Sequence, residues 1–242
     1  MAQANTRSNT GFSELDFMNR HVNALFTHDD HGRLRRVNES DGAQAPRFFL
    51  GRTSAGNIWR FRFDLPDSLT EHLESLCLKE PVLTDLRQEP AGLSEYISLL
   101  ETHSPVKKLS SGPAYFFPDA IGQTSSQAVL VTPENVNVLR QGFEDWLLDV
   151  HRQPFLAILD EGHAVSVCCS VRVTAEAHEA GVETLNDYKG RGCASDIVQQ
   201  WAAEVLKLGA MPLYSTSWQN VASQGVARRL GLIQYGSDFH VT

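Results

Sequence analysis

Two glycines separated by one residue, Gly190 and Gly192, lie in a short segment in which Lys189 and Arg191 are basic. Because glycine has no Cβ atom, it lets the backbone approach a ligand closely. If a helix starts directly afterwards, its first N–H groups lack partners within the helix and carry partial positive charge. Such a segment can bind a phosphate or pyrophosphate through its backbone. The alternative interpretation is an ordinary strand-to-helix turn, in which the glycines serve only the geometry of the chain.

The residues around these glycines predict the strand and the helix that such a site requires. Val182 and Thr184 belong to a short alternation of apolar and polar residues, which is typical of a strand over 180–185. Beyond the glycines, apolar residues recur at spacings of three and four, which predicts a helix over 194–208 that ends at Gly209. The segment therefore has the order strand, glycine turn, helix.

Three kinds of phosphate-binding loop have this order. The Walker pattern G-x-x-x-x-G-K-[ST] does not occur in the sequence. Gly190, Gly192 and Ser195 match the G-x-G-x-x-G fingerprint of dinucleotide-binding proteins except at its third glycine. That fingerprint also requires an acidic residue at the end of the next strand, where this sequence has only Ser and Thr at 215–217. A nucleotide-dependent oxidoreductase is therefore the less favoured interpretation.

The third kind is the acetyl-CoA loop of the GNAT superfamily of N-acyltransferases, whose pattern is [Q/R]-x-x-G-x-[G/A]. Residues 189–194 resemble it, with Lys in the first place instead of Gln or Arg. Residues 220–232 resemble the superfamily's second signature, N-x-x-[AS]-x-x-x-[YA]-x-x-x-G-[FL], at the expected distance. The resemblance covers roughly residues 127–242, about one domain of typical size.

This resemblance implies transfer of an acyl group, which we expect to be acetyl, from acetyl-CoA to a primary amine of a small molecule or a peptide. It implies that the backbone near Thr184 and Leu185 pairs with the pantetheine arm of the cofactor. It also implies that Asn220 contacts the cofactor at the start of the last helix, a position where Asn is equally a good helix cap. The pyrophosphate would be bound by Lys189, Gly190, Arg191, Gly192, Cys193, Ala194 and Ser195.

Direct transfer requires a neutral amine, so a general base or a water chain must remove a proton. Glu183 is the candidate base, because it lies in the strand before the loop, where the family often places this residue. The alternative interpretation of Glu183 is a surface carboxylate. As general acid the family commonly uses a Tyr at the position that here is Ala227, so Ser223, Tyr214 or Tyr235 would have to replace it.

Two further interpretations concern the mechanism. Cys193 could form a covalent acyl-enzyme, but no histidine lies near it in the sequence, and direct transfer is the better hypothesis. The missing Tyr at position 227 keeps open a non-catalytic acyl-CoA-binding regulatory protein.

The composition is that of a globular protein with a sizeable core: 242 residues, of which 42% are hydrophobic and 21% charged. The net charge of −8 argues against nucleic acid as the main partner, because nucleic-acid-binding surfaces are usually basic. No segment has the roughly 18 apolar residues of a membrane span, and the N-terminus lacks the apolar core of a secretory signal. We therefore predict a cytoplasmic protein with four free cysteines. A homodimer is one possible oligomeric state.

Two local patterns have weaker functional interpretations. The sequence His28-Asp29-Asp30-His31 lacks further ligands at suitable spacing, so we predict no metal site. In the strand over 58–63, Arg60 and Arg62 alternate with aromatic residues. Such a stripe can bind nucleic acid, but a half-buried strand is the favoured interpretation in an acidic chain.

The sequence predicts an α+β fold with a mixed, mostly antiparallel, twisted sheet flanked by helices. We expect an N-terminal α+β domain over 1–126 and a GNAT-like domain over 127–242, with the boundary at 121–126. In the first part we predict helices over 12–30, 66–79 and 91–103, strands over 48–53 and 58–63, a loop at 110–113 and an edge strand over 114–117. In the second we predict strands over 128–131, 155–159, 164–173 and 212–217, and a helix over 138–150.

Overall fold

The computed structural model describes residues 11–118 and 127–242, and its centre is a nine-stranded sheet with the order β4-β3-β11-β5-β10-β9-β8-β7-β6. A small second sheet pairs β1 with β2. Within the nine-stranded sheet, β9 and β10 are parallel and every other neighbouring pair is antiparallel. The predicted mixed, mostly antiparallel sheet is confirmed. The strands are β1 (Phe26–His28), β2 (Leu34–Val37), β3 (Phe48–Thr53), β4 (Gly56–Phe61), β5 (Leu109–Phe116), β6 (Val129–Leu130), β7 (Phe155–Asp160), β8 (His163–Val173), β9 (Ala177–Thr184), β10 (Met211–Ser215) and β11 (Ile233–Val241).

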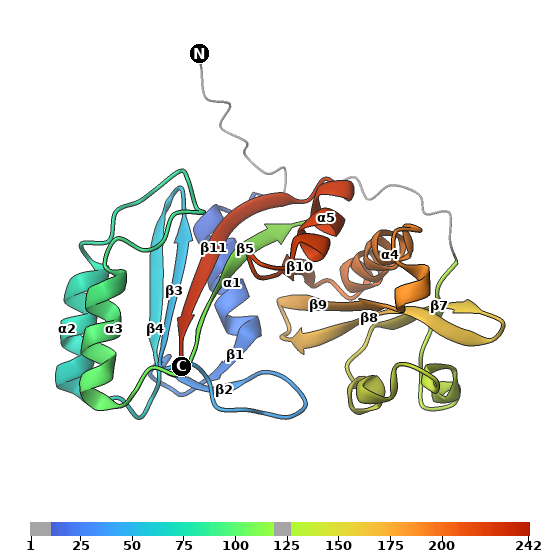
Figure 1. The fold of residues 1–242 in the computed structure, drawn as a ribbon, viewed down its shortest axis with the longest axis horizontal. Helices are drawn as coiled ribbons and strands as arrows, with labels where there is room; N and C mark the ends of the chain where they lie inside the picture. Colours follow the sequence, from blue (N-terminus) through green and yellow to red (C-terminus); the bar gives the residue numbers. More distant parts are fainter. Residues whose placement is uncertain (1–10, 119–126) are drawn as a thin grey trace, which may run out of the picture.

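Helices cover both faces of this sheet (Figure 1). One face packs on α1 and on two short 3-10 helices, η1 and η2, and the other packs on α2 to α5, as the alternation of buried residues along the strands requires. The predicted helices over 66–79, 91–103 and 194–208 are confirmed within two residues at each end, and the first helix is shorter than predicted. The helices are α1 (Glu14–Leu25), α2 (Asp67–Cys77), α3 (Leu93–His103), η1 (Val136–Leu139), η2 (Glu144–Asp149), η3 (Asn186–Tyr188), α4 (Cys193–Lys207) and α5 (Val221–Arg229).

Strand β5 lies in the middle of the sheet, between β10 and β11. The strand predicted over 114–117 is confirmed as part of β5, but its predicted place at a sheet edge and the loop predicted at 110–113 were wrong. A glycine followed by a proline suggested a loop, but here Gly112 has another role: an added Cβ atom would lie 1.6 Å from the carbonyl oxygen of Thr216. Pro113 lies within the strand, and its carbonyl accepts a hydrogen bond from the N–H of Thr216. The close approach of the chain after β10, rather than a turn, accounts for the glycine.

The helix predicted over 138–150 was also wrong, because the structure has η1 and η2 there with a break between them. Gln141 and Gly142 have φ angles of +81° and +136°, which no α-helix accommodates. The buried side chains of Leu139 and Phe143 still pack on β7 and β8 as the apolar pattern implied. Leu139, Phe143 and Val150 are buried whereas Leu147 is 39% exposed, so the spacing predicted only part of the buried face and did not predict the backbone conformation.

The boundary predicted at 121–126 lies outside the described residues. Strands from both sides of it share one sheet, because β11 pairs with β3 and β5 and β10 pairs with β5. The division into two domains stays a prediction. Within the described residues, no helix combines the length and the apolar character that crossing a membrane requires.

Candidate functional site

The parallel strands β9 and β10 separate after a short stretch of pairing. Their paired residues end at Glu179 opposite Leu213. Beyond this point β9 stays with β8 as far as Thr184, whereas β10 stays with β5 as far as Ser215. Side chains at even positions of β9 face α4, and those at odd positions face α1 and η2. The separation of the two strands therefore has two chemically distinct sides.

A cavity of about 550 Å³ lies on the side of α4 and α5. Its walls come from the end of β9, the loop that follows, the first turn of α4, and α5. Of the twelve residues predicted from the sequence, Arg191 is the exception that does not line it. The lining includes Glu183, Thr184, Leu185, Lys189, Gly190, Gly192, Cys193, Ala194, Ser195, Asn220 and Ser223. The structure thus brings together two motifs that are separate in the sequence.

The loop before α4 depends on its two glycines. Gly190 has a φ angle of +77° and Gly192 one of +94°, a conformation that side chains disfavour. Gly192 is also the N-cap residue of α4 and, having no side chain, makes no side-chain cap hydrogen bond to the first N–H groups of that helix. These donors belong to residues that line the cavity. An anionic group in the cavity would therefore meet backbone N–H donors and the positive end of the helix dipole.

Three basic side chains surround this loop. Lys189 donates a hydrogen bond from Nζ to Asn186 Oδ1 over 2.7 Å. Arg191 is exposed and stacks on the ring of Tyr188, 4.8 Å from its centre. Arg229 extends from α5 to the loop, so that a Cβ atom on Gly192 would lie 3.0 Å from its Nη2. Sequence reasoning missed Arg229, although it belongs to the second signature, because that pattern does not specify its position.

The start of α5 supplies the polar groups at the other wall. Asn220 caps the helix, since its Oδ1 accepts a hydrogen bond from the N–H of Ser223 over 3.0 Å. The Ser223 hydroxyl lies 2.7 Å from that of Tyr214, and either can donate. Burial raises the pKa of Tyr214 to about 12, so this phenol is protonated at neutral pH. Ala227 is buried beside this pair in the core under α4.

Tyr235 was an alternative general acid, but it does not line this cavity. Its ring packs on Phe17 in the core beneath α1, and its hydroxyl is buried without a hydrogen-bond partner in the described structure. Tyr214 and Ser223 are therefore the pair of candidate acids that the cavity contains.

Glu183 is exposed at an odd position of β9 and accepts a hydrogen bond from Trp146 Nε1 over 2.6 Å. Trp146 belongs to η2, so the short helix that replaced the predicted one positions this carboxylate. Next to it, the Thr184 hydroxyl lies 2.7 Å from Ser166 Oγ on β8. Cys193 is half-buried, and the cavity lining contains no histidine that could activate it.

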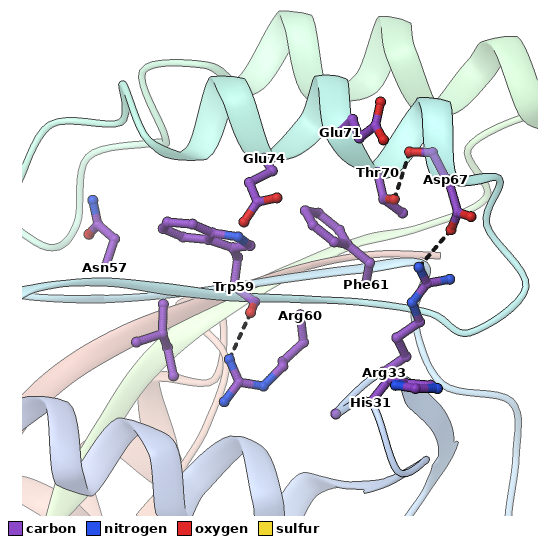
Figure 2. A pocket seen from close by; sticks show the side chains of 12 residues that line it. His31, Arg33, Asn57, Trp59, Arg60, Phe61, Asp67, Thr70, Glu71 and Glu74 are labelled. Atoms are coloured by element: carbon purple, nitrogen blue, oxygen red, sulfur yellow. Dashed lines mark hydrogen bonds and ion pairs between the residues drawn. The ribbon is translucent and has the colours of Figure 1, made fainter.

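A second cavity, of about 840 Å³, lies at the outer edge of β4 and contains none of the predicted site residues (Figure 2). Trp59 and Phe61 point from β4 toward α2, and Arg60 points to the opposite side of the strand. Arg60 Nη1 donates to the carbonyl of Trp59, and Arg62 Nε donates to Asp64 Oδ1. Because these guanidinium groups are engaged within the protein, they do not form a free basic stripe.

The acidic and histidine residues after β1 form a turn. Asp29 Oδ1 accepts hydrogen bonds from the backbone N–H groups of His31 and Arg33, each 2.9 Å long. Among residues 11–118 and 127–242, no group of three or more His, Cys, Asp or Glu side chains is arranged to hold a metal ion.

Comparison with known proteins gives a family and distant structural relatives. Residues 155–237 match the family model described as GNAT acetyltransferase, and no curated protein matches the chain. Among solved structures, a GNAT-family acetyltransferase from Novosphingobium aromaticivorans is 15% identical with a TM-score of 0.46; the match covers 56% of this chain and 65% of that one. This chain thus spans less than two thirds of that relative.

Two further structures are similar over more of their length. A GNAT-family acetyltransferase from Colwellia psychrerythraea is 12% identical, with a TM-score of 0.48 and coverage of 76% of this chain and 75% of that one. A GCN5-related N-acetyltransferase-like protein from Streptococcus suis is 17% identical, with a TM-score of 0.47 and coverage of 82% and 85%. The assignment itself rests on the family model, whose match contains the loop, α4, α5 and both separated strands. Residues 155–237 are therefore similar to the GNAT acetyltransferases, in agreement with the resemblance noted in the sequence.

Proposed function

We propose that the protein is an N-acetyltransferase that moves an acetyl group from acetyl-CoA to a primary amine by direct transfer. The observation that carries this proposal is the cavity between the separated strands, where the glycine loop, the uncapped start of α4 and the Asn220 helix start meet. Acetyl-CoA has a pyrophosphate to place against the N–H donors and an extended arm to place along β9. The family match supports acyl transfer in general, and the acetyl group and the amine belong to the proposal.

Each part of the cavity has a role in this reaction. The backbone of 189–195 and Arg229 would hold the pyrophosphate, and the backbone near Thr184 and Leu185 would pair with the pantetheine arm beyond the point where β10 departs. Glu183, held by Trp146, would take a proton from the incoming ammonium group so that its nitrogen gains a free electron pair. The neutral amine then attacks the thioester carbonyl.

The departing thiolate has two hydroxyl groups within the cavity to receive it. Tyr214 and Ser223 are hydrogen-bonded to each other, and the high pKa of Tyr214 makes it a hydrogen-bond donor rather than a strong acid. They would stabilise the thiolate by hydrogen bonding, and the thiolate needs little help because thiol pKa values lie near 8.5. This pair is our candidate replacement for the Tyr that is absent at position 227.

A non-catalytic acyl-CoA-binding protein is the second candidate function, and Ala227 is the observation that favours it. Such a protein would use the same cavity and lack turnover. Glu183 argues for catalysis, because a carboxylate at this place has no role in holding an anionic cofactor.

Calorimetric titration with acetyl-CoA, NADH and NADPH, followed by turnover with a panel of primary amines read by thiol release, separates these functions. The proposal predicts saturable binding of acetyl-CoA without binding of either dinucleotide, and thiol release with at least one amine. Binding of NADH or NADPH in place of acetyl-CoA would support an oxidoreductase. Binding of acetyl-CoA without thiol release for any amine would support the regulatory protein.

A further inference from the structure

A cluster of charged side chains is buried on the α1 side of the sheet, directly where β9 and β10 separate. His21 of α1 lies between two carboxylates: its Nδ1 is 2.5 Å from Glu179 Oε1, and its Nε2 is 2.7 Å from Asp238 Oδ2. Glu179 is the last residue of β9 that pairs with β10, and Asp238 belongs to β11. Three elements that are distant in the sequence thus meet in one ionic contact.

This cluster is almost completely removed from solvent. The side chains of His21 and Glu179 are 0% and 1% exposed, and that of Asp238 is 11% exposed. Burying a charged group is costly, and buried ion pairs often stabilise a fold less than apolar residues of the same size would. Stability alone is therefore a weak explanation for this arrangement.

A hydroxyl group extends the cluster to the end of β10, at the gap between the diverging strands, although it does not belong to the lining of the cavity described above. Ser215 is the last residue of β10, is half-buried, and donates a hydrogen bond from Oγ to Glu179 Oε2 over 3.1 Å. Ser215 and Glu183 lie on the diverging ends of β10 and β9, on the side that faces α1 and η2. A continuous path of polar atoms therefore runs from Ser215 through Glu179 and His21 to Asp238.

The proposed reaction must dispose of two protons from the acceptor nitrogen. An ammonium group loses the first before attack, and the proposed base Glu183 receives it. The second leaves after attack: the C–N bond forms, the carbonyl π electrons move to oxygen, and the nitrogen becomes positively charged and acidic. Breaking this N–H bond returns the electron pair to nitrogen, and the C–S bond then breaks with its electrons on sulfur.

We infer that Ser215 and Glu179 form a relay for this second proton, with His21 and Asp238 as positioning residues; the inference rests on the proposed function. The nitrogen gives its proton to Ser215 Oγ while the hydroxyl proton of Ser215 passes to Glu179 Oε2. Atoms and charge balance, because the carboxylate becomes a carboxylic acid and the nitrogen becomes a neutral amide.

The charges of the cluster at neutral pH follow from the contacts of His21. Burial opposes a charge on His21, but Glu179 and Asp238 outweigh it and raise the pKa of His21 to about 9, so the ring is an imidazolium at neutral pH. With two carboxylates the cluster then carries one net negative charge, and one added proton neutralises it. Other polar groups lie near the cluster. His240 Nε2 is 3.5 Å from Asp238 Oδ1, and Arg172 and the Tyr235 hydroxyl are also close enough to interact electrostatically with it.

Ser215→Ala tests the relay without breaking the ionic cluster. The variant removes only the hydroxyl, and we expect kcat to fall by about 10²-fold, the lower end of what general acid–base groups contribute, with parental affinity for acetyl-CoA. Ser215→Thr keeps a hydroxyl and is expected to recover most of the lost rate. Ser110→Ala, at another half-buried serine on β5, is the matched control for a lost strand hydroxyl.

The dependence on pH distinguishes the relay from the proposed base. For Glu183→Gln the loss should shrink at high pH, because the amine is already neutral there, whereas for Ser215→Ala it should persist because the second proton must still leave. Parental kcat in Ser215→Ala, or a loss that vanishes at high pH, would overturn the relay and leave the proposed function intact. Absence of acetyl-CoA binding in the parent protein would instead overturn the proposed function and the relay with it.

Discussion

The two sides of the β9–β10 separation contain opposite kinds of polar chemistry. On the α4 side, backbone N–H groups and glycines form an open cavity with basic side chains at its rim. On the α1 side, His21, Glu179 and Asp238 form a closed ionic cluster with almost no access to solvent. Backbone donors suit an anion that must enter and leave, whereas buried side chains suit a proton that moves a short distance. One pair of strands can position both the anion-binding donors and the buried proton-binding side chains, because alternate residues of a strand face opposite sides of the sheet.

The largest effect on kcat is expected for Glu183, the proposed general base near the end of β9. Glu183→Gln keeps the shape of the side chain and its contact with Trp146 but removes the proton acceptor. If Glu183 is the base, kcat should fall by about 10²–10⁴-fold while acetyl-CoA affinity stays parental. Steady-state kinetics with an amine substrate and calorimetry measure the two quantities. Parental kcat at neutral pH would leave Glu183 as a surface carboxylate.

The next effect concerns the folding stability of the buried cluster. His21→Leu removes the only imidazolium between Glu179 and Asp238 and leaves two buried carboxylates close together. We expect the free energy of unfolding to drop by about 3–5 kcal/mol, as for other broken buried ion pairs. Lys189→Ala in the exposed loop is the control and should change it by less than about 1 kcal/mol. Similar unfolding midpoints in denaturant for both variants would contradict the expectation that the buried cluster contributes more to folding stability than the exposed loop does.

The cluster also predicts how stability depends on pH. The folded pKa of His21, about 9, lies above the ordinary value of 6.5. The stabilisation is therefore fully present below about pH 6.5 and is lost as the pH rises through 9. At about 1.4 kcal/mol per pKa unit, the loss is on the order of 3 kcal/mol. Denaturant unfolding at a series of pH values measures it, and a flat profile over this window would show that His21 is neutral in the folded protein.

A smaller effect tests the loop. Gly192→Asp forces a side chain into a left-handed conformation against Arg229 and places a negative charge at the start of α4. The strain of roughly 1–2 kcal/mol, with the added repulsion, should weaken acetyl-CoA binding by roughly tenfold or more. Gly209→Asp, which places the same charge at a glycine with no atom near its Cβ position, is the control. Equal affinities in the two variants would show that the pyrophosphate binds elsewhere.

The smallest effect is expected at Cys193. Direct transfer needs no covalent intermediate, so Cys193→Ala should retain kcat within about twofold, against the 10²-fold or greater losses typical of true acid–base groups. Mass spectrometry of the parent protein with acetyl-CoA checks the same point. A trapped acetyl-enzyme together with an inactive variant would replace direct transfer by a two-step mechanism.

The α4 side could be predicted from the sequence because its determinants are local. Gly190, Gly192 and Asn220 each act through the few residues next to them, so their spacing indicates their role. The buried cluster has no such signal, since His21 and Asp238 are brought together by the position of β11 between β3 and β5. The same non-local pairing placed β5 in the sheet interior, where its Gly112 and Pro113 had suggested a loop.

The position of β11 between β3 and β5 also determines when, during synthesis, the central part of the sheet can form. Its partners β3 and β5 are synthesised long before residues 233–241 leave the ribosome. At roughly 5–20 residues per second, this interval is on the order of ten seconds, during which neither strand can form its native pairing with β11. Unpaired strand edges invite contact with other chains. The nascent polypeptide, rather than the folded protein, is therefore the form most exposed to aggregation and the one on which chaperones would act.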